Sequence, residues 1–232
     1  MAHQLALPLG FNARQGFGQF WPGPNDEVVA HLRQAALGQG DSPLFIWGVE
    51  GAGKTHLLNA ACALASDHGR RAAYLPLRTL SALGPDILTG VDQFDVVCVD
   101  DLDPIAGLPE WEVALFELFN QLRDHGRTLL ISARRPPPQL PFRLPDLQSR
   151  LAWGLTLHIH PLREDDTLQA LSLQAKALGM DLTPAAGRFL MSHTRRDLPA
   201  LLTLLQQLDR ASLAAQRRLT IPFIKSQIGE QA

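Results

Sequence analysis

The chain has 232 residues, 46% of them hydrophobic and 19% charged, with a formal net charge of −2. That length holds one domain and a smaller second one, and the near-neutral charge excludes a protein that binds nucleic acid through a uniformly basic surface. No apolar run approaches the roughly 20 residues that a membrane span requires, and the N-terminus lacks the features of a secretory signal. Cys62 and Cys98 both lie in apolar segments, which indicates core residues in a reducing compartment and a cytoplasmic location.

The segment QLALPL near the N-terminus is extended, because Pro8 disfavours a helix. It fits either a first edge strand or irregular terminus, or a docking peptide for a partner. In the second interpretation Gln4 is a polar anchor, and Leu7 and Leu9 fill an apolar pocket. The docking peptide then spans residues 1–10, with partner contacts from Gln4, Leu5, Leu7, Pro8 and Leu9.

An aromatic turn, FGQFWPGPN, precedes a helix that Asn25 or Asp26 is expected to cap. Trp21 and Pro22 within this turn have two interpretations. They either pack against the core or line an adenine pocket beside the next motif, and their spacing leaves both open.

The segment Gly48–Thr55, GVEGAGKT, fits the P-loop pattern G-x-x-x-x-G-K-[ST]. Glycines let the backbone approach a phosphate closely, and the following helix directs its N–H groups at the anion. Lys54 supplies a positive charge to the β- and γ-phosphates, while Thr55 offers a hydroxyl to Mg²⁺. The apolar run before this turn and the helical pattern after it disfavour a merely structural turn. The residues expected to contact a nucleoside di- or triphosphate are Gly48, Gly51, Ala52, Gly53, Lys54, Thr55 and His56.

An apolar strand from Phe94 ends in two carboxylates, Asp100 and Asp101, which is a Walker B pattern. Asp100 is predicted to hold Mg²⁺, and Asp101 to orient or deprotonate the attacking water. The alternative is an acidic helix cap after a buried strand, which the P-loop in the same chain makes less favourable.

Strands alternate with helices up to residue 161, which predicts an α/β fold with a parallel sheet covered on both faces. The helix at 109–125 carries an apolar stripe that indicates core packing. The predicted strands are 44–47, 72–75, 94–101, 128–132 and 155–160.

From residue 162 the pattern is purely helical, with helices expected at 165–178, 184–193 and 197–217 and a last one from Pro222. We therefore expect a nucleotide-binding α/β domain over 11–161 and an all-α lid subdomain over 162–232.

The P-loop, the Walker B strand, the polar strand end at Ser132, the DLQSRL segment and the helical lid together resemble the AAA+ ATPases. The aromatic turn resembles the base-binding segment of the DnaA-type initiator clade. The tail QLDRASLAAQRRLTIPFIKSQI and the QLALPL start are similar to the Hda-type regulatory inactivators of DnaA, whose N-terminal peptide binds the sliding clamp.

This resemblance implies roles for two arginines. Arg150 in DLQSRL matches the family's arginine finger, which reaches the γ-phosphate held by a neighbouring protein; the alternative is a surface salt bridge. Arg196 in RRDL matches the sensor that contacts the chain's own nucleotide.

One residue departs from the family pattern. Two positions after Ser132 the family usually has a carboxylate, whereas this chain has Arg134, which cannot accept a hydrogen bond from water. We therefore expect weak hydrolysis or none by the chain's own site.

The resemblance implies a regulator of replication initiation that binds adenine nucleotide with Mg²⁺ and the DNA-loaded sliding clamp, the DNA polymerase III beta subunit. It would stimulate hydrolysis of ATP bound to DnaA and contact DNA only through the clamp, with no membrane partner. No basic helix-turn-helix segment follows the lid, so an initiator is not expected. Homo-oligomerisation is left open. The alternatives are a helicase loader, another AAA+ adaptor or, from a different class, a small-molecule P-loop kinase.

Overall fold

The structure, a computed structural model, describes residues 10–12, 15–193, 197–215 and 219–229, and it forms two compact units. One unit contains Asn25–His160 with the residues before Gly18, and the other contains Gly18–Pro24 with the residues from Pro161 onward. Within those ranges no helix combines the length and the apolar character needed to cross a bilayer.

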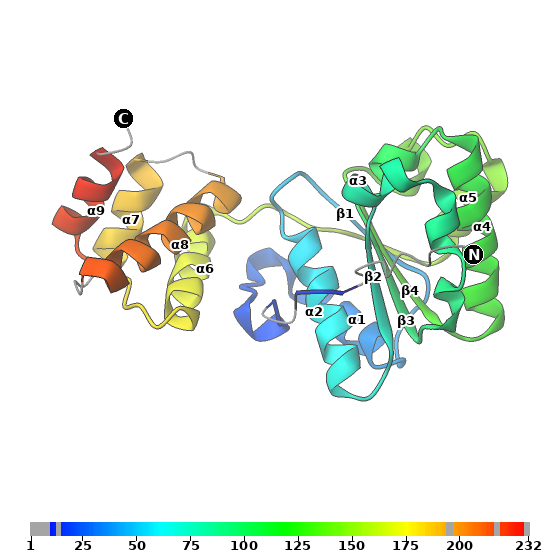
Figure 1. Cartoon of the computed structure of the whole chain (residues 1–232), viewed down its shortest axis with the longest axis horizontal. Helices are drawn as coiled ribbons and strands as arrows, with labels where there is room; N and C mark the ends of the chain where they lie inside the picture. The colour runs from blue at the N-terminus through cyan, green and yellow to red at the C-terminus, as the bar shows by residue number, and fades with distance from the viewer. Residues whose placement is uncertain (1–9, 13–14, 194–196, 216–218, 230–232) are drawn as a thin grey trace, which may run out of the picture. The chain divides into compact units, whose positions relative to one another are not determined.

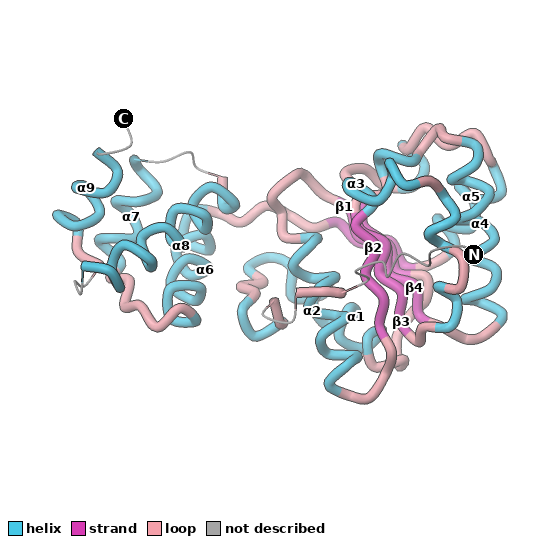
Figure 2. Tube along the Cα trace, viewed as in Figure 1, coloured by secondary structure: helices cyan, strands magenta, loops and turns pink. Residues whose placement is uncertain are grey.

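A five-stranded parallel sheet forms the centre of the first unit (Figure 2). Its order is β2-β3-β4-β1-β5, so β1 lies between β4 and β5. Parallel strands whose two faces are both covered need largely apolar sequences, as β1 and β3 have, whereas the edge strand β5 alternates and is only partly buried. Ligands of such sheets bind at the carboxyl ends of the strands, where the strand order reverses. The strands are β1 Leu44–Trp47, β2 Ala72–Pro76, β3 Val96–Asp100, β4 Thr128–Ala133 and β5 Leu155–His158.

Helices cover both faces of the sheet, which makes three layers and confirms the predicted α/β fold class. Helices α1 and α2 lie on one face, and α4 and α5 lie on the other (Figure 1). The α-helices of this unit are α1 Asp26–Ala36, α2 Lys54–Asp67, α3 Leu77–Leu80, α4 Pro109–Asp124 and α5 Pro145–Trp153. Short 3-10 helices occur at Phe17–Gln19, Gly23–Asn25, Ser81–Leu83, Pro85–Leu88, Val91–Gln93, Asp103–Ile105 and Pro137–Gln139.

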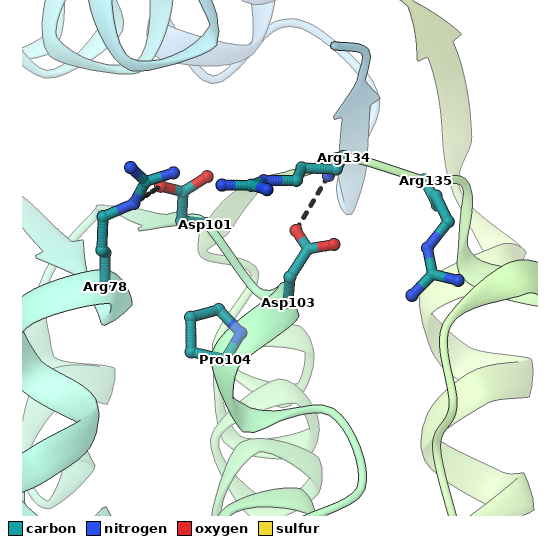
Figure 3. Close-up of a pocket in the computed structure, with 6 residues that line it drawn as sticks. All are labelled: Arg78, Asp101, Asp103, Pro104, Arg134 and Arg135. Carbon is teal, nitrogen blue, oxygen red and sulfur yellow. Dashed lines mark hydrogen bonds and ion pairs between the residues drawn. The ribbon is translucent and has the colours of Figure 1, made fainter. Parts of the chain in front are cut away.

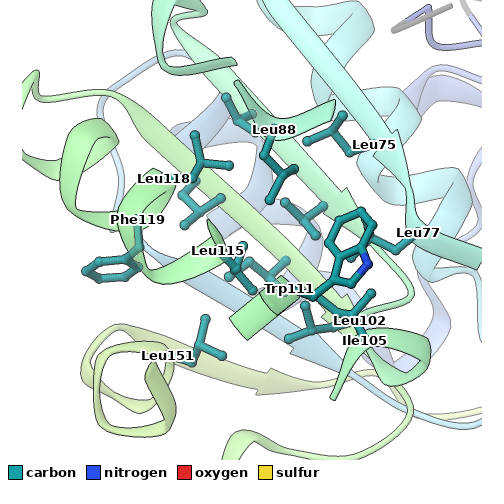
Figure 4. Packing of buried hydrophobic residues seen from close by; sticks show 14 of the residues in the cluster. Leu75, Leu77, Leu88, Leu102, Ile105, Trp111, Leu115, Leu118, Phe119 and Leu151 are labelled. Carbon is teal, nitrogen blue, oxygen red and sulfur yellow. The ribbon is translucent and has the colours of Figure 1, made fainter. Parts of the chain in front are cut away.

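The main hydrophobic core lies between the sheet and α4 (Figure 4). Trp111, Leu115, Leu118 and Leu122 recur at helical spacing along one side of α4, and all four are buried. Leu151 of α5 is buried in the same cluster. The helix α5 is therefore held against the sheet domain by its apolar side.

Glu112 of α4 is a completely buried carboxylate that fixes the chain entering α5. Its Oε1 accepts the N–H of Gly107 at 2.7 Å, and its Oε2 accepts the N–H groups of Arg143 at 2.9 Å and Leu144 at 2.7 Å. A buried carboxylate is tolerated when such donors surround it. Glu112 thus joins the loop after β3 to the start of α5.

The first helix begins as predicted, but the side chain of Asn25 does not cap it. Asn25 occupies the N-cap position without a capping hydrogen bond. Its Oδ1 accepts the N–H of His160 at 2.8 Å, and its Nδ2 donates to the carbonyl of His160 at 3.0 Å. Because both ends of the amide are engaged there, Asn25 joins the start of α1 to the end of the first unit.

The second unit is helical and has its own core, which includes Leu171, Leu190, Leu205 and Ile224. Residues Gly18–Pro24 of the aromatic turn belong to this unit, and the indole N–H of Trp21 donates to Asp166 Oδ1 at 3.0 Å. The helices of this unit are α6 Glu164–Ala177, α7 Pro184–His193, α8 Leu198–Ala215 and α9 Ile221–Gly229.

Candidate functional site

The P-loop connects β1 to α2, and two of its glycines are required by geometry. A Cβ on Gly48 would lie 2.5 Å from the carbonyl oxygen of Ile159. Gly53 has φ +100°, a left-handed conformation that favours glycine, immediately before α2 begins. The N–H of Ala52 donates to Val49 O at 3.3 Å and closes the turn between them.

Lys54 is buried at the start of α2 and folds back over the loop. Its Nζ donates to the carbonyls of Gly48 at 2.8 Å and Val49 at 3.0 Å. Burial lowers the pKa of Lys54, and the charges of Asp101 and Asp100 oppose this shift. The ammonium group is therefore held inside the loop by two neutral carbonyl acceptors.

Asp100, at the end of β3, is the shared acceptor of three hydroxyl groups and is only 3% exposed. Thr55 Oγ1 donates to its Oδ2 at 2.8 Å, and Tyr74 donates to the same oxygen at 2.6 Å. Ser132 donates to Oδ1. Burial, followed by the charge of Asp100, raises the pKa of Tyr74, so the phenol remains a donor. One carboxylate thereby ties α2, β2, β3 and β4 together.

Asp101 has φ +56° and is the one non-glycine position with positive φ among the residues that the structure describes. Aspartate tolerates this left-handed conformation better than most residues. The turn is fixed by Ser132, whose hydroxyl accepts the N–H of Asp101 at 3.0 Å and whose carbonyl accepts that of Leu102 at 2.9 Å. Strained backbone of this kind occurs most often at functional sites.

Two arginines bridge the P-loop to the ends of the neighbouring strands. Arg78 donates through Nε to Asp101 Oδ2 at 2.9 Å and through Nη1 to Glu50 Oε1 at 2.9 Å. Arg134 Nη2 lies 3.0 Å from Glu50 Oε2, and its backbone N–H donates to Asp103 Oδ2 at 2.8 Å. The hydrogen bond from Arg78 and then the charge of Arg134 lower the pKa of Glu50. Both guanidinium groups are therefore neutralised within the site.

These residues border a hollow of about 530 Å³ next to the Walker B carboxylates (Figure 3). Figure 3 shows the side chains of Arg78 and Arg134 converging on Asp101 from opposite sides. The lining residues are Arg78, Asp101, Asp103, Pro104, Arg134 and Arg135.

The oxygen atoms of Thr55 and Asp100 fit a magnesium ion that a nucleotide brings with it. Throughout the described ranges no three His, Cys, Asp or Glu side chains lie together as a complete ligand set. Mg²⁺ commonly takes one or two protein oxygens, with phosphates and water completing its octahedron. A hydroxyl and a carboxylate 2.8 Å apart at the P-loop suit that arrangement.

His56, predicted to contact nucleotide, faces the N-terminal segment through its Nε2. This nitrogen donates to the carbonyl of Gly16 at 3.0 Å, and burial lowers the pKa of His56. Asn12 donates its N–H to Asn59 Oδ1 at 2.7 Å, so the segment is joined to α2 at two points. Contact between His56 and nucleotide stays a prediction.

Arg150 is half-buried on α5, and its Cζ lies 5.0 Å from the ring centroid of Trp153. Among the described residues no carboxylate forms an ion pair with it, and its role as an arginine finger stays a prediction. Trp21 and Pro22 belong to the second unit, and their adenine contact stays a prediction. Arg196, Gln4, Leu5, Leu7, Pro8 and Leu9 lie outside the described residues.

The sequence did not reveal three participants in the site, Tyr74, Arg78 and Glu50. Tyr74 is the single tyrosine of the chain and lies in an apolar strand. Its hydroxyl in these surroundings is the one feature of the sequence that could have indicated a buried polar partner. Arg78 and Glu50 are ordinary surface residues in the sequence, and only the folded chain brings them together.

Two family models match the chain. One, described as the lid domain of Hda, matches residues 164–228, and one described as the bacterial DnaA ATPase domain matches residues 11–80 and 86–158.

Solved structures are similar in fold. Domain III of the Thermotoga maritima replication initiation protein DnaA has a TM-score of 0.82 and 22% identity over 95% of this chain and 98% of that chain. AMPPCP-bound DnaA from Aquifex aeolicus has a TM-score of 0.70 and 23% identity over 84% of this chain and 66% of that chain. The Thermotoga maritima RuvB Holliday junction branch migration motor has a TM-score of 0.61 and 16% identity over 88% of this chain and 68% of that chain. At these identities the matches show the AAA+ fold, including a helical lid.

We predict that Tyr74→Phe lowers the free energy of unfolding by about 2 kcal/mol, because a buried carboxylate loses one of three hydrogen bonds. Glu50→Gln is expected to leave stability unchanged, because ion pairs in exposed positions contribute little. Urea denaturation of both variants measures their free energies of unfolding. Equal shifts of the urea midpoint in the two variants would contradict the expectation that Tyr74 contributes more than Glu50.

Proposed function

Because the chain belongs to the DnaA-related AAA+ family and has an Hda-type lid, we propose that it inactivates the initiator DnaA by stimulating hydrolysis of DnaA-bound ATP. The observation that carries the proposal is Arg150, a half-buried arginine on α5 that no carboxylate in the described ranges neutralises. Such a group is suited to an anion supplied by another molecule.

The first element of the proposal is that the chain binds ADP or ATP with Mg²⁺. Gly48 and Gly53 are required by the turn of the loop, Lys54 lies inside the loop, and Thr55 adjoins Asp100. The Aquifex aeolicus DnaA with a similar fold carries AMPPCP. When bound, the metal would neutralise phosphate charge. In this site Lys54 would exchange its carbonyl acceptors for phosphate oxygens.

The second element is that the chain hydrolyses its own ATP weakly or not at all. Asp101, the residue expected to activate water, already accepts a hydrogen bond from Arg78. Arg134 is joined to Glu50 beside it and offers no acceptor for water. The site thus supports retention of nucleotide more than its turnover.

The third element is that Arg150 acts on ATP held by DnaA. A guanidinium group that reaches a γ-phosphate stabilises the charge that develops during phosphoryl transfer. The helix α5 presents Arg150 from a fixed position, since Leu147 and Leu151 are buried and Glu112 holds the preceding loop.

The fourth element is delivery to DNA by the sliding clamp, through residues 1–10. The motif QLALPL supports it by sequence alone. The following segment is joined to α2 through Asn12 and Gly16, so a bound clamp would be coupled to the P-loop domain. A small-molecule kinase would need neither this peptide nor Arg150.

We predict that Lys54→Ala abolishes nucleotide binding and the accompanying rise in melting temperature, since a ligand stabilises the fold that binds it. Titration with a fluorescent ATP analogue and thermal melting with ADP measure the two effects. Lys176→Ala, which removes an exposed lysine from α6, is the control and should behave as the parent. Retained binding in Lys54→Ala would contradict the nucleotide site.

A second prediction concerns the docking peptide. Combining Gln4→Ala with Leu7→Ala should weaken clamp binding by about tenfold or more, because apolar anchors of this kind contribute most of the energy of small interfaces. Nucleotide binding should be unchanged. Surface plasmon resonance on immobilised clamp measures the loss, with His3→Ala as the control inside the peptide. If the double variant binds the clamp with the affinity of the parent, residues 1–10 are not the clamp-binding peptide.

The decisive prediction concerns Arg150. Arg150→Ala should lower the stimulated hydrolysis of DnaA–ATP by roughly 10³-fold or more, because arginine fingers contribute 10³ to 10⁵ in rate. Arg150→Lys should restore little, since an ammonium lacks the planar fork of a guanidinium. Phosphate release from DnaA–ATP with clamp and DNA is the assay.

The matched control is Arg143→Ala, because this exposed arginine precedes α5 and contacts Glu112 through its backbone. Full stimulation by Arg150→Ala, with normal clamp and nucleotide binding, would rule out the proposed function and favour a loader or adaptor.

A further inference from the structure

The last residue of α5, Trp153, has 65% of its surface exposed. Among the large hydrophobic residues of the described ranges this is the highest exposed fraction, above Leu83 at 59% and Val49 at 55%. Tryptophan is usually well buried, and tryptophan and arginine are enriched among the residues that contribute most to binding at protein interfaces.

Trp153 and Arg150 form a single surface on α5. They are three residues apart and so lie on neighbouring positions of one helix face, and the guanidinium carbon is 5.0 Å from the indole centroid. The core-facing side of the same helix is formed by Leu147 and Leu151, both completely buried. The indole lies outside the main core cluster, and its exposed surface is available to another molecule.

We propose that Trp153 and Arg150 together form the docking surface for the ATP-bearing subunit, in which the indole holds the guanidinium and is itself buried against that subunit. This inference rests on the proposed function and adds a residue to it. A guanidinium is weakly hydrated and stacks on aromatic faces. The ring can thus keep Arg150 oriented before the partner arrives, which lowers the entropy lost on binding.

The charges of the surface favour a protein-bound triphosphate over free nucleic acid. Arg150 is accompanied on the exposed side of α5 by Asp146 and Ser149 rather than by further cations. Binding to a nucleic-acid backbone requires several phosphate contacts, whereas a triphosphate in a protein pocket needs one guanidinium. The apolar indole then matches the protein surface that surrounds the triphosphate.

The test is a titration of the full-length protein into DnaA–ATP with clamp and DNA, followed by phosphate release. Trp153→Ala should raise the half-saturating concentration at least about tenfold, as expected for an interface anchor. Trp153→Leu keeps much apolar area without a π face, so it should lower the maximal rate more than it raises the half-saturating concentration. Trp153→Phe should approach the parent.

Leu83→Ala is the matched control, because it removes a similarly exposed apolar side chain from a different segment of the same unit. Melting temperature and ADP binding should not change in any of these variants, since the altered side chains are exposed.

The outcomes separate the two proposals. If Trp153→Ala stimulates as the parent does while Arg150→Ala is inactive, the docking surface is wrong and the proposed function stands. If Arg150→Ala also stimulates normally, the proposed function fails. A loss in Leu83→Ala as large as in Trp153→Ala, or a maximal rate of Trp153→Leu equal to that of the parent, likewise overturns the role of the indole.

Discussion

The carboxylate of Asp100 is the interaction on which the arrangement of the site depends. A buried charge is unfavourable unless donors surround it, and here hydroxyls from Thr55, Tyr74 and Ser132 do so. These donors come from three different elements, so the carboxylate fixes the first turn of α2 against β2 and β4. The positions of the P-loop and of the Walker B strand are therefore determined by one group.

In the proposed function the site binds nucleotide but hydrolyses ATP weakly or not at all, and the adjacent Asp101 suggests a reason. Its left-handed backbone is imposed by Ser132, and this conformation directs the carboxylate to Arg78. The expectation of weak hydrolysis therefore rests on Arg78 as well as on Arg134. Arg78 and Arg134 are bridged across the P-loop by Glu50, and Asp101 supplies the second negative charge that balances them.

The sequence predicted the parts of the fold that depend on local patterns. The P-loop, the five strands and the lid helices were found from periodicity and fixed spacing. Tyr74 was missed because its role depends on the register of β2 with β3, where it pairs with Cys98, two residues before Asp100. The capping role expected of Asn25 failed because His160, 135 residues away, competes for its amide. Contacts between distant segments cannot be read from local patterns.

In the proposed function α5 presents Arg150 to another protein, and Glu112 supplies the physical support for that helix. This buried carboxylate joins Gly107, which follows the Walker B strand, to Leu144 at the start of α5. A fully hydrogen-bonded buried group resists rearrangement, so Glu112 holds the start of α5 against the loop that follows β3. The proposed presentation of Arg150 needs a rigid support and does not depend on hydrolysis by the chain itself. It is therefore consistent with a P-loop site in which Arg78 and Arg134 are paired with carboxylates.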